Sequence, residues 1–300
     1  MVIETYDLTK QFDNKGGFKN ISLSVKEGEV FSFLGKNGAG KSTFIRTLVG
    51  ILYPTGGSGF ILGEPIGNIE ARKKMGYLPE LFQYHSWLTG YELLFNHGLL
   101  YKMNKNDIKN RIDEVLQIVG LKGHEHKKVK QYSKGMKQRI GLGCAILCDP
   151  KLLFLDEPTS ALDPVGRKHV RDIILRLKNE GKTIFLNTHL LSEVELVSDR
   201  VAILDKGEIK KIGNIKELMY SPLVLSIGNC SEKIINELKS FDPCLQKIDN
   251  EIEMHIHNDE AIPKIAESIV KNKGLLYMMK RKENILEELF IKTVGEEEEA

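Results

Sequence analysis

Apolar side chains along this chain follow two different periods, which separate short strands from longer helices. Residues 2–8 and 21–25 alternate apolar and polar positions, as strands with one buried face do. The predicted strands are residues 2–8, 21–25, 29–34, 59–63, 75–80, 151–157, 183–187, 200–204 and 207–213, with a sharp turn at 53–59. Helical spacing begins at Phe44 and recurs over 133–148 and about 165–180. Strands that alternate with helices predict an α/β fold.

Residues 81–132 break this alternation. Their apolar positions have helical spacing and little strand character, so we expect a helical insertion that forms, with the next helix, a subdomain over about 81–150. Its predicted core positions are Ile108, Ile112, Val115, Leu116 and Val119. Aromatic residues crowd its beginning: Tyr77, Phe82, Tyr84, Trp87, Tyr91, Phe95 and Tyr101. They are either the insertion's own core or a groove for a helix of a partner.

A second domain follows Pro222. Residues 223–294 read as strand, helix, strand, strand, helix, strand, helix, and the βαββαβ part of that order is the ferredoxin-like arrangement of a small α+β domain. We therefore expect domains at 1–215 and 222–294, with 295–300 as a solvated acidic tail. His255 and His257 alternate on one predicted strand and share a face, but we assign them no metal.

Composition narrows the class of protein. Three hundred residues suggest two domains, and the net charge of +2 argues against nucleic acid or anionic lipid as partner. Four cysteines without a C-x-x-C pair fit a reducing compartment, and Cys144 and Cys148, one helical turn apart, read as small buried side chains. The N-terminus carries no evident signal peptide, and no apolar run approaches the roughly 18 residues that span a membrane. Any membrane role then requires a separate partner.

Residues Gly35–Thr43 read GKNGAGKST and fit the phosphate-binding loop G-x-x-x-x-G-K-[ST] between a predicted strand and a predicted helix. The glycines let consecutive N–H groups point into one cavity, and the helix N-terminus adds its positive end. Lys41 would reach the β- and γ-phosphates, and the Ser42 hydroxyl could join a Mg²⁺ shell. The loop residues are Gly35, Lys36, Asn37, Gly38, Ala39, Gly40, Lys41, Ser42 and Thr43.

Other polar residues stand at strand or helix ends. Asp156 and Glu157 end a buried strand, where ligands of α/β sheets bind, so Asp156 could hold Mg²⁺ and Glu157 could polarise water. His189 follows the strand 183–187, and Ser133 is an expected helix N-cap. Phe12, in the first turn-rich loop, could stack on a base or close the edge of the core.

Taken together, these motifs resemble those of the ATP-binding subunits of ATP-binding cassette (ABC) transporters. The resemblance covers roughly residues 1–215, with Gly35–Thr43 as Walker A, Leu152–Asp156 as Walker B and YSKGM at Tyr132–Met136 in place of the signature LSGGQ. It implies a P-loop ATPase core. The residues to which it assigns roles are Phe12 on adenine, Glu157 as catalytic base, Ser133 and Gly135 in the signature, Asp163 in the D-loop and His189 as the switch histidine.

Two positions depart from the family's pattern. Glu80 stands where the family usually has the Q-loop glutamine, and a carboxylate suits Mg²⁺ but would repel a γ-phosphate. Gln83 is the alternative for that role. Lys36 replaces a proline common in the loop.

The resemblance also implies a mechanism and partners. Two copies, or this chain and a second ABC subunit, would enclose two ATP molecules with Mg²⁺, and hydrolysis would reopen the dimer. A multi-span membrane permease at the cytoplasmic face of the cell membrane would receive that motion. The signature, the single cassette and the small C-terminal domain resemble the subclass that energises exporters of drugs, antibiotics, sodium or polysaccharides. A soluble ABC ATPase and a regulatory module that binds ATP without hydrolysing it remain the alternatives.

Overall fold

The computed structural model describes residues 1–13, 16–160, 162–219, 221–248, 251–256, 258–282 and 285–295. The chain divides into two compact units, Met1–Ile215 and Lys216–Gly295. The predicted acidic tail lies outside the described residues, apart from Gly295. Each unit has a hydrophobic core of its own residues and is described by itself.

An antiparallel sheet begins the first unit. Its strand order is β2-β1-β4-β5, with bounds β1 Ile3–Gln11, β2 Gly17–Val25, β4 Gly56–Ile61 and β5 Glu64–Pro65. The predicted turn at 53–59 is therefore too long, because β4 already starts at Gly56, opposite Thr9. A Cβ at Gly57 would lie 2.2 Å from the carbonyl oxygen of Asp7. Only glycine allows this close pairing, so a glycine run that reads as a turn forms a strand.

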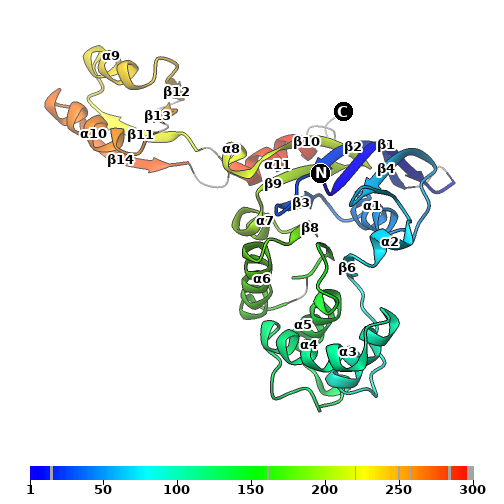
Figure 1. Cartoon of the computed structure of the whole chain (residues 1–300). Coiled ribbons are helices and arrows are strands. Elements are labelled where there is room, and N and C mark those ends of the chain that lie inside the picture. Colours follow the sequence, from blue (N-terminus) through cyan, green and yellow to red (C-terminus); the bar gives the residue numbers. More distant parts are fainter. Residues whose placement is uncertain are drawn as a thin grey trace. The chain divides into compact units, whose positions relative to one another are not determined.

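A six-stranded sheet forms the centre of the same unit, in the order β10-β9-β3-β8-β7-β6 (Figure 1). Its strands are β3 Val30–Leu34, β6 Met75–Leu78, β7 Leu152–Asp156, β8 Thr183–Thr188, β9 Arg200–Asp205 and β10 Glu208–Asn214. All neighbours pair in parallel except β10, which is antiparallel to β9. Every position of β3, β7 and β8 is buried, as their apolar runs predict. The carboxyl ends of β3, β6, β7 and β8 therefore meet at one edge.

Helix α1 (Lys41–Leu48) packs between the two sheets (Figure 1). Phe44 on α1 contacts Phe18 of β2, Phe33 of β3 and Phe185 of β8, with ring centroids 4.9–6.0 Å away. Edge-to-face and offset rings at these separations stabilise a core beyond the area they bury. This aromatic cluster fixes where α1 starts relative to the strand ends.

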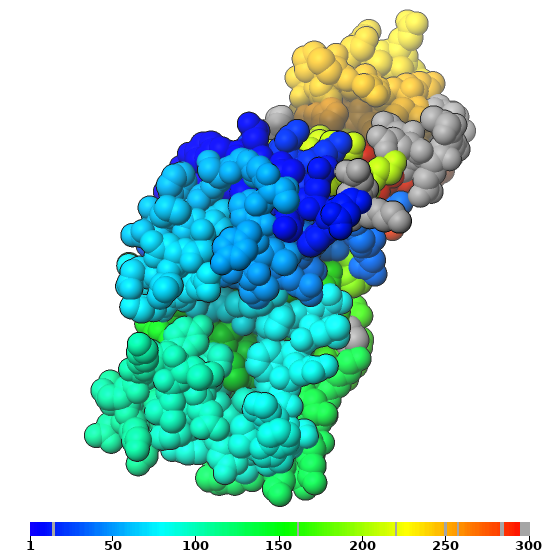
Figure 2. All heavy atoms as spheres, turned by 90° about the vertical axis from the view of Figure 1, so that its right-hand side faces the viewer, coloured from blue at the N-terminus to red at the C-terminus, as the bar shows by residue number. Residues whose placement is uncertain are grey.

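The predicted helical insertion is present between β6 and β7 as α3 (Gly90–Leu100), α4 (Lys105–Ile118) and α5 (Lys134–Ile146). Figure 2 shows it, from cyan to green, as a lobe beside the blue sheets. All five predicted core positions are at most 1% exposed: Ile108, Ile112, Val115, Leu116 and Val119. Among the aromatics, Tyr84, Tyr91 and Phe95 pack against this core, whereas Trp87 is 65% exposed. The core interpretation is therefore confirmed for Tyr84, Tyr91 and Phe95, and the groove for a helix of a partner stays a prediction.

The remaining helices of this unit are α2 (Ile69–Arg72), α6 (Pro164–Asn179) and α7 (Leu191–Val197). The sequence predicts α6 but not α7, which is short and follows directly on a strand end. Cys144 is buried, as predicted, and burial raises the pKa of its thiol to about 12. Cys148 is only half-buried, with its Sγ 3.5 Å from Met103 Sδ.

The second unit has the predicted βαββαβ order, followed by a helix. After α8 (Ile215–Leu218), its elements are β11 Leu223–Gly228, α9 Glu232–Phe241, β12 Gln246–Ile248, β13 Glu251–Met254, α10 Ala261–Lys271, β14 Leu275–Arg281 and α11 Ile285–Gly295. The sheet order is β12-β13-β11-β14, antiparallel throughout. His255 follows β13, and its main-chain N–H donates to Asp242 Oδ2 at 2.7 Å, whereas His257 lies outside the described residues.

Across the described ranges, no helix has the length and apolar character needed to cross a lipid bilayer.

Candidate active site

The loop between β3 and α1 needs its glycines. Gly38 and Gly40 have φ angles of 85° and 100°, in the left-handed region that side chains disfavour. A Cβ at Gly35 would lie 2.4 Å from the carbonyl oxygen of Leu204, and one at Gly40 would lie 2.3 Å from that of Gly17. At Gly35 and Gly40 the main chain therefore lies too close to a neighbouring carbonyl oxygen for any residue other than glycine.

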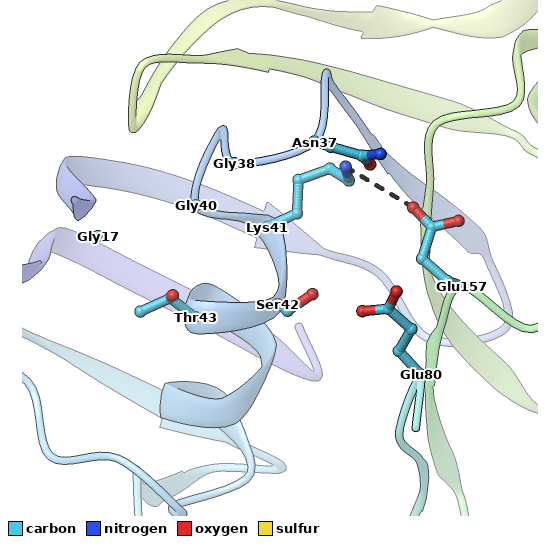
Figure 3. A pocket seen from close by; sticks show the side chains of 9 residues that line it. All are labelled: Gly17, Asn37, Gly38, Gly40, Lys41, Ser42, Thr43, Glu80 and Glu157. Carbon is cyan, nitrogen blue, oxygen red and sulfur yellow. Dashed lines mark ion pairs between the residues drawn. The ribbon is translucent and has the colours of Figure 1, made fainter. Parts of the chain in front are cut away.

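Lys41 begins α1 and is 6% exposed. Its Nζ donates to the carbonyl oxygens of Gly35 at 2.8 Å and Lys36 at 3.2 Å, and lies 3.7 Å from Glu157 Oε1 (Figure 3). Burial holds the pKa of Lys41 below its usual value, although the carboxylates of Glu157 and Asp156 oppose that shift. The ammonium group thus points along its own loop, beside the acid that directly follows β7.

Asp156 ends β7 and is fully buried. Its Oδ1 accepts hydrogen bonds from Ser42 Oγ at 3.1 Å and from the side-chain amide of Asn187, whereas Oδ2 has no partner among the described residues. Burial raises the pKa of Asp156, more than these hydrogen bonds lower it. One carboxylate and one hydroxyl fit Mg²⁺, which takes few protein ligands and keeps waters or phosphate oxygens. In the described part of the chain, no group of three acidic, histidine or cysteine residues offers a complete cage.

Glu157 follows at once, with a φ of 50° that is uncommon outside glycine. Its N–H donates to the carbonyl oxygen of Asn187 at 2.9 Å, and its Oε2 lies 2.9 Å from His189 Nδ1. The residue is 4% exposed, and its side chain lies between Lys41 and His189. A carboxylate oriented in this way can accept a proton from water.

Lys41, Ser42 and Glu157 line a pocket of about 250 Å³ at the carboxyl edge of the sheet. Its lining is Gly17, Asn37, Gly38, Gly40, Lys41, Ser42, Thr43, Glu80 and Glu157. Asp156 and His189 are not among its lining residues, but they contact Ser42 and Glu157, which are. Figure 3 shows the Glu80 carboxylate between Ser42 and Glu157. Gln83 is exposed and does not line the pocket, so the structure brings Glu80, rather than its alternative, to the predicted phosphate loop.

Several predicted site residues do not line this pocket. Ser133 caps α5 by accepting from the Met136 N–H at 3.2 Å, and Asp163 caps α6 by accepting from the Gly166 N–H at 2.8 Å. Gly135, in the first turn of α5, and Lys36 and Ala39, in the loop, are also outside the lining.

Phe12 is 42% exposed and is likewise not among the lining residues. The Lys10 ammonium lies 5.1 Å from the centre of its ring, a cation–π contact at the surface. An exposed ring is open to a ligand, so stacking on a base stays a prediction, as does a position that closes the edge of the core.

Two residues of the site have no place in the sequence motifs. Gly17 lines the pocket at a φ of 106°, where a Cβ would lie 2.0 Å from the Lys10 carbonyl oxygen. Asn187 contacts both acids from β8. A polar residue that ends the otherwise apolar run 184–187 was the available signal for Asn187, whereas Gly17 gave none.

Known proteins are similar to this chain over most of its length. A family model described as "ABC transporter" matches residues 18–160. An ABC transporter ATP-binding protein of Synechocystis sp. is 43% identical over 229 residues, which are 73% of this chain and 64% of that protein, so the chain spans just under two thirds of its length. The bacitracin transport ATP-binding protein BcrA of Bacillus licheniformis is 34% identical over 302 residues, 98% of this chain and 97% of that protein. A solved dimeric ATP-binding cassette in a post-hydrolysis state, bound to ADP and Pi, is 26% identical with a TM-score of 0.64, covering 71% of this chain and 98% of its own.

Proposed function

The chain belongs to the ATP-binding proteins of ABC transporters, and we propose that it binds ATP with Mg²⁺ and hydrolyses it to drive a separate membrane-spanning subunit. One observation carries the hydrolytic part of this proposal. Glu157, a buried carboxylate, stands at the predicted phosphate loop between Lys41 and His189. A protein that only held ATP would not need an acid in contact with a histidine at this position.

Each side chain has one task in this reaction. The loop N–H groups and the Lys41 ammonium group bind the phosphates and neutralise their charge, since phosphoryl transfer depends mainly on positioning and electrostatics. Ser42 and Asp156 would hold Mg²⁺, which neutralises charge on the phosphate oxygens when it is bound. Glu157 orients a water and accepts its proton at Oε1 or Oε2. His189 holds Glu157 through Nδ1 and contacts the γ-phosphate.

A second chain would complete the site. Ser133 and Gly135 begin α5, whose unpaired N–H groups suit an anion, yet they do not line the pocket of their own chain. If two chains meet head to tail, the α5 N-terminus of each lies over the ATP of the other, and Asp163 couples the two sites. The solved dimeric cassette with ADP and Pi supports this arrangement. The pair is either a homodimer or this chain with a second ABC subunit.

The partner we propose is a multi-span permease of an exporter, with this chain on the cytoplasmic face of the membrane. Similarity over nearly the full length to a bacitracin transport protein supports the exporter class. The net charge of +2 gives no reason to propose nucleic acid as a ligand. Recovery of the chain with membranes when it is co-expressed with its permease, and in the supernatant when it is expressed alone, checks this part.

The catalytic role is tested with Glu157→Gln. We expect the variant to bind ATP as the wild type does and to form a dimer with ATP, while kcat falls by about 10²–10⁴-fold because the general base is lost. ATPase assays and gel filtration with and without ATP measure the two effects. Glu180→Gln, which removes an exposed carboxylate paired with Arg176, is the control and should change neither. Turnover at the wild-type rate by Glu157→Gln would contradict the assignment.

A further inference from the structure

Asn187 contacts both acids of the site. It lies on β8 directly opposite Asp156 on β7, and it is fully buried. Its side-chain amide group donates to Asp156 Oδ1, and its main-chain carbonyl accepts the N–H of Glu157 at 2.9 Å. One residue of β8 therefore contacts the side chain of the first acid and the main chain of the second.

The contact with Asp156 sets how its carboxylate is turned. The terminal side-chain torsion of an aspartate has a broad range of favourable angles. The hydrogen-bond partners of the carboxylate therefore determine in which direction each oxygen points. Here Oδ1 accepts from both Ser42 and Asn187, and Oδ2 is left without a donor from the described residues. Without the amide group, Ser42 alone would define the orientation.

Filling space in the core does not explain why residue 187 has an amide side chain. Ile184, Phe185 and Leu186, the preceding residues of β8, are apolar and buried. A buried amide destabilises the fold unless it is fully hydrogen-bonded, and Asn187 Oδ1 has no donor among the described residues. An apolar residue would fill the space without that penalty.

At this edge of the sheet, three buried acceptor oxygens have no hydrogen-bond donor among the described residues: Asp156 Oδ2, Glu157 Oε1 and Asn187 Oδ1. Glu157 Oε1 faces the Lys41 ammonium group at 3.7 Å, whereas the other two oxygens have no donor among the described residues and suit a proton or a cation from outside the chain. We propose that Asn187 is a positioning residue for Mg²⁺-dependent ATP hydrolysis: its amide group holds Asp156 with Oδ2 free to serve the hydrated ion, and its carbonyl holds Glu157 in place. This inference rests on the proposed ATPase function.

The test compares Asn187→Asp, which keeps the shape but removes the donor, with Asn187→Ser, which stays neutral and is too short to reach Asp156. Mn²⁺ binding in the presence of ADP, followed by electron paramagnetic resonance, reports the metal site without turnover. We expect the half-saturating Mn²⁺ concentration to rise by about ten-fold in both variants, with a fall in kcat and little change in the KM for ATP at saturating metal. Thermal unfolding without nucleotide shows whether each variant is folded.

A swapped double variant, Asp156→Asn with Asn187→Asp, separates positioning from stability. This variant rebuilds the contact between an amide and a carboxylate, but with the carboxylate on β8 instead of β7. Thermal stability should therefore return toward that of the wild type, whereas Mn²⁺ binding should stay weak. Wild-type Mn²⁺ binding and kcat in a folded Asn187→Asp or Asn187→Ser variant would overturn the proposal, as would full recovery of Mn²⁺ binding in the swap. A wild-type chain that binds Mn²⁺ with ADP but shows no ATPase would instead refute the proposed function.

Discussion

Lys41 is the cation of the predicted phosphate loop, and this makes its removal informative. In the structure its Nζ donates to two carbonyl oxygens of its own loop and faces Glu157. With ATP it would contact the phosphates. For Lys41→Ala we therefore predict loss of the rise in melting temperature that ATP gives the wild type, because ligand stabilisation follows affinity.

Thermal shift with and without Mg²⁺-ATP measures this effect. Lys36→Ala is the matched control, since it removes a cation from an exposed position of the same loop. We expect the control to keep most of the shift. An unchanged shift in Lys41→Ala would refute its role in phosphate binding.

At the scale of single residues, local chemistry was readable from the sequence and long-range contacts were not. The motif at Gly35–Thr43 has a local geometry of its own, and Lys41, Ser42 and part of the loop line the pocket, while their roles toward a nucleotide stay predictions. Asn187 has its role only because β7 and β8 pair with Asp156 opposite it. That register joins segments about thirty residues apart, and no local pattern encodes it. Glu80 was expected at the site, but its choice over Gln83 needed the fold.

Helix α3 carries a titratable group whose environment predicts a pH dependence. Burial lowers the pKa of His97 on α3, and its ring lies 5.2 Å from that of Tyr101. Below pH 6.5, the usual pKa of histidine, His97 binds a proton in the unfolded chain more readily than in the folded chain. The free energy of unfolding therefore falls as the pH drops. The effect is absent above that pH, where both states are neutral.

Wild-type protein should lose free energy of unfolding between pH 8 and pH 5.5. We predict that His97→Gln reduces this loss, because glutamine does not bind a proton in this pH range. Urea unfolding at the two pH values measures that loss. His85→Gln, at an exposed position, is the control. An equal loss in the wild type and in His97→Gln would mean that the burial of this histidine does not affect acid stability.

Elements with a strong period were predicted well, and elements set by their neighbours were not. The amphipathic pattern of 108–119 identified a real helix with the correct buried face. The sequence also contains a signal for the start of α3, because Thr89 and Glu92 have the spacing of a capping box. The start of β4 at Gly56 and the short helix α7 depend on pairing and packing with distant segments, so sequence periodicity could not define them.

At the scale of the whole molecule, the domain boundary near residue 215 was predicted because the order of strands and helices along the sequence changes after it. The two units have separate cores: Phe44 and Ile112 belong to clusters of the first unit, and Leu225 and Ile265 belong to the cluster of the second. The sequence could not specify what a second chain contributes, because Ser133 and Asp163 show in one chain only that they cap helices.

Separate cores lead to a prediction for unfolding of the intact chain. We expect calorimetry to resolve two transitions, since each unit buries its own apolar surface and can unfold by itself. Mg²⁺-ATP should raise only the transition of the first unit, by about 2.7 kcal/mol in free energy at a hundred times its dissociation constant. Variants distinguish the transitions: Ile112→Ala should lower the one that ATP shifts, and Ile265→Ala the other. A single transition that ATP raises as a whole, and that both variants lower, would mean that the second unit is coupled to the nucleotide site and takes part in its control.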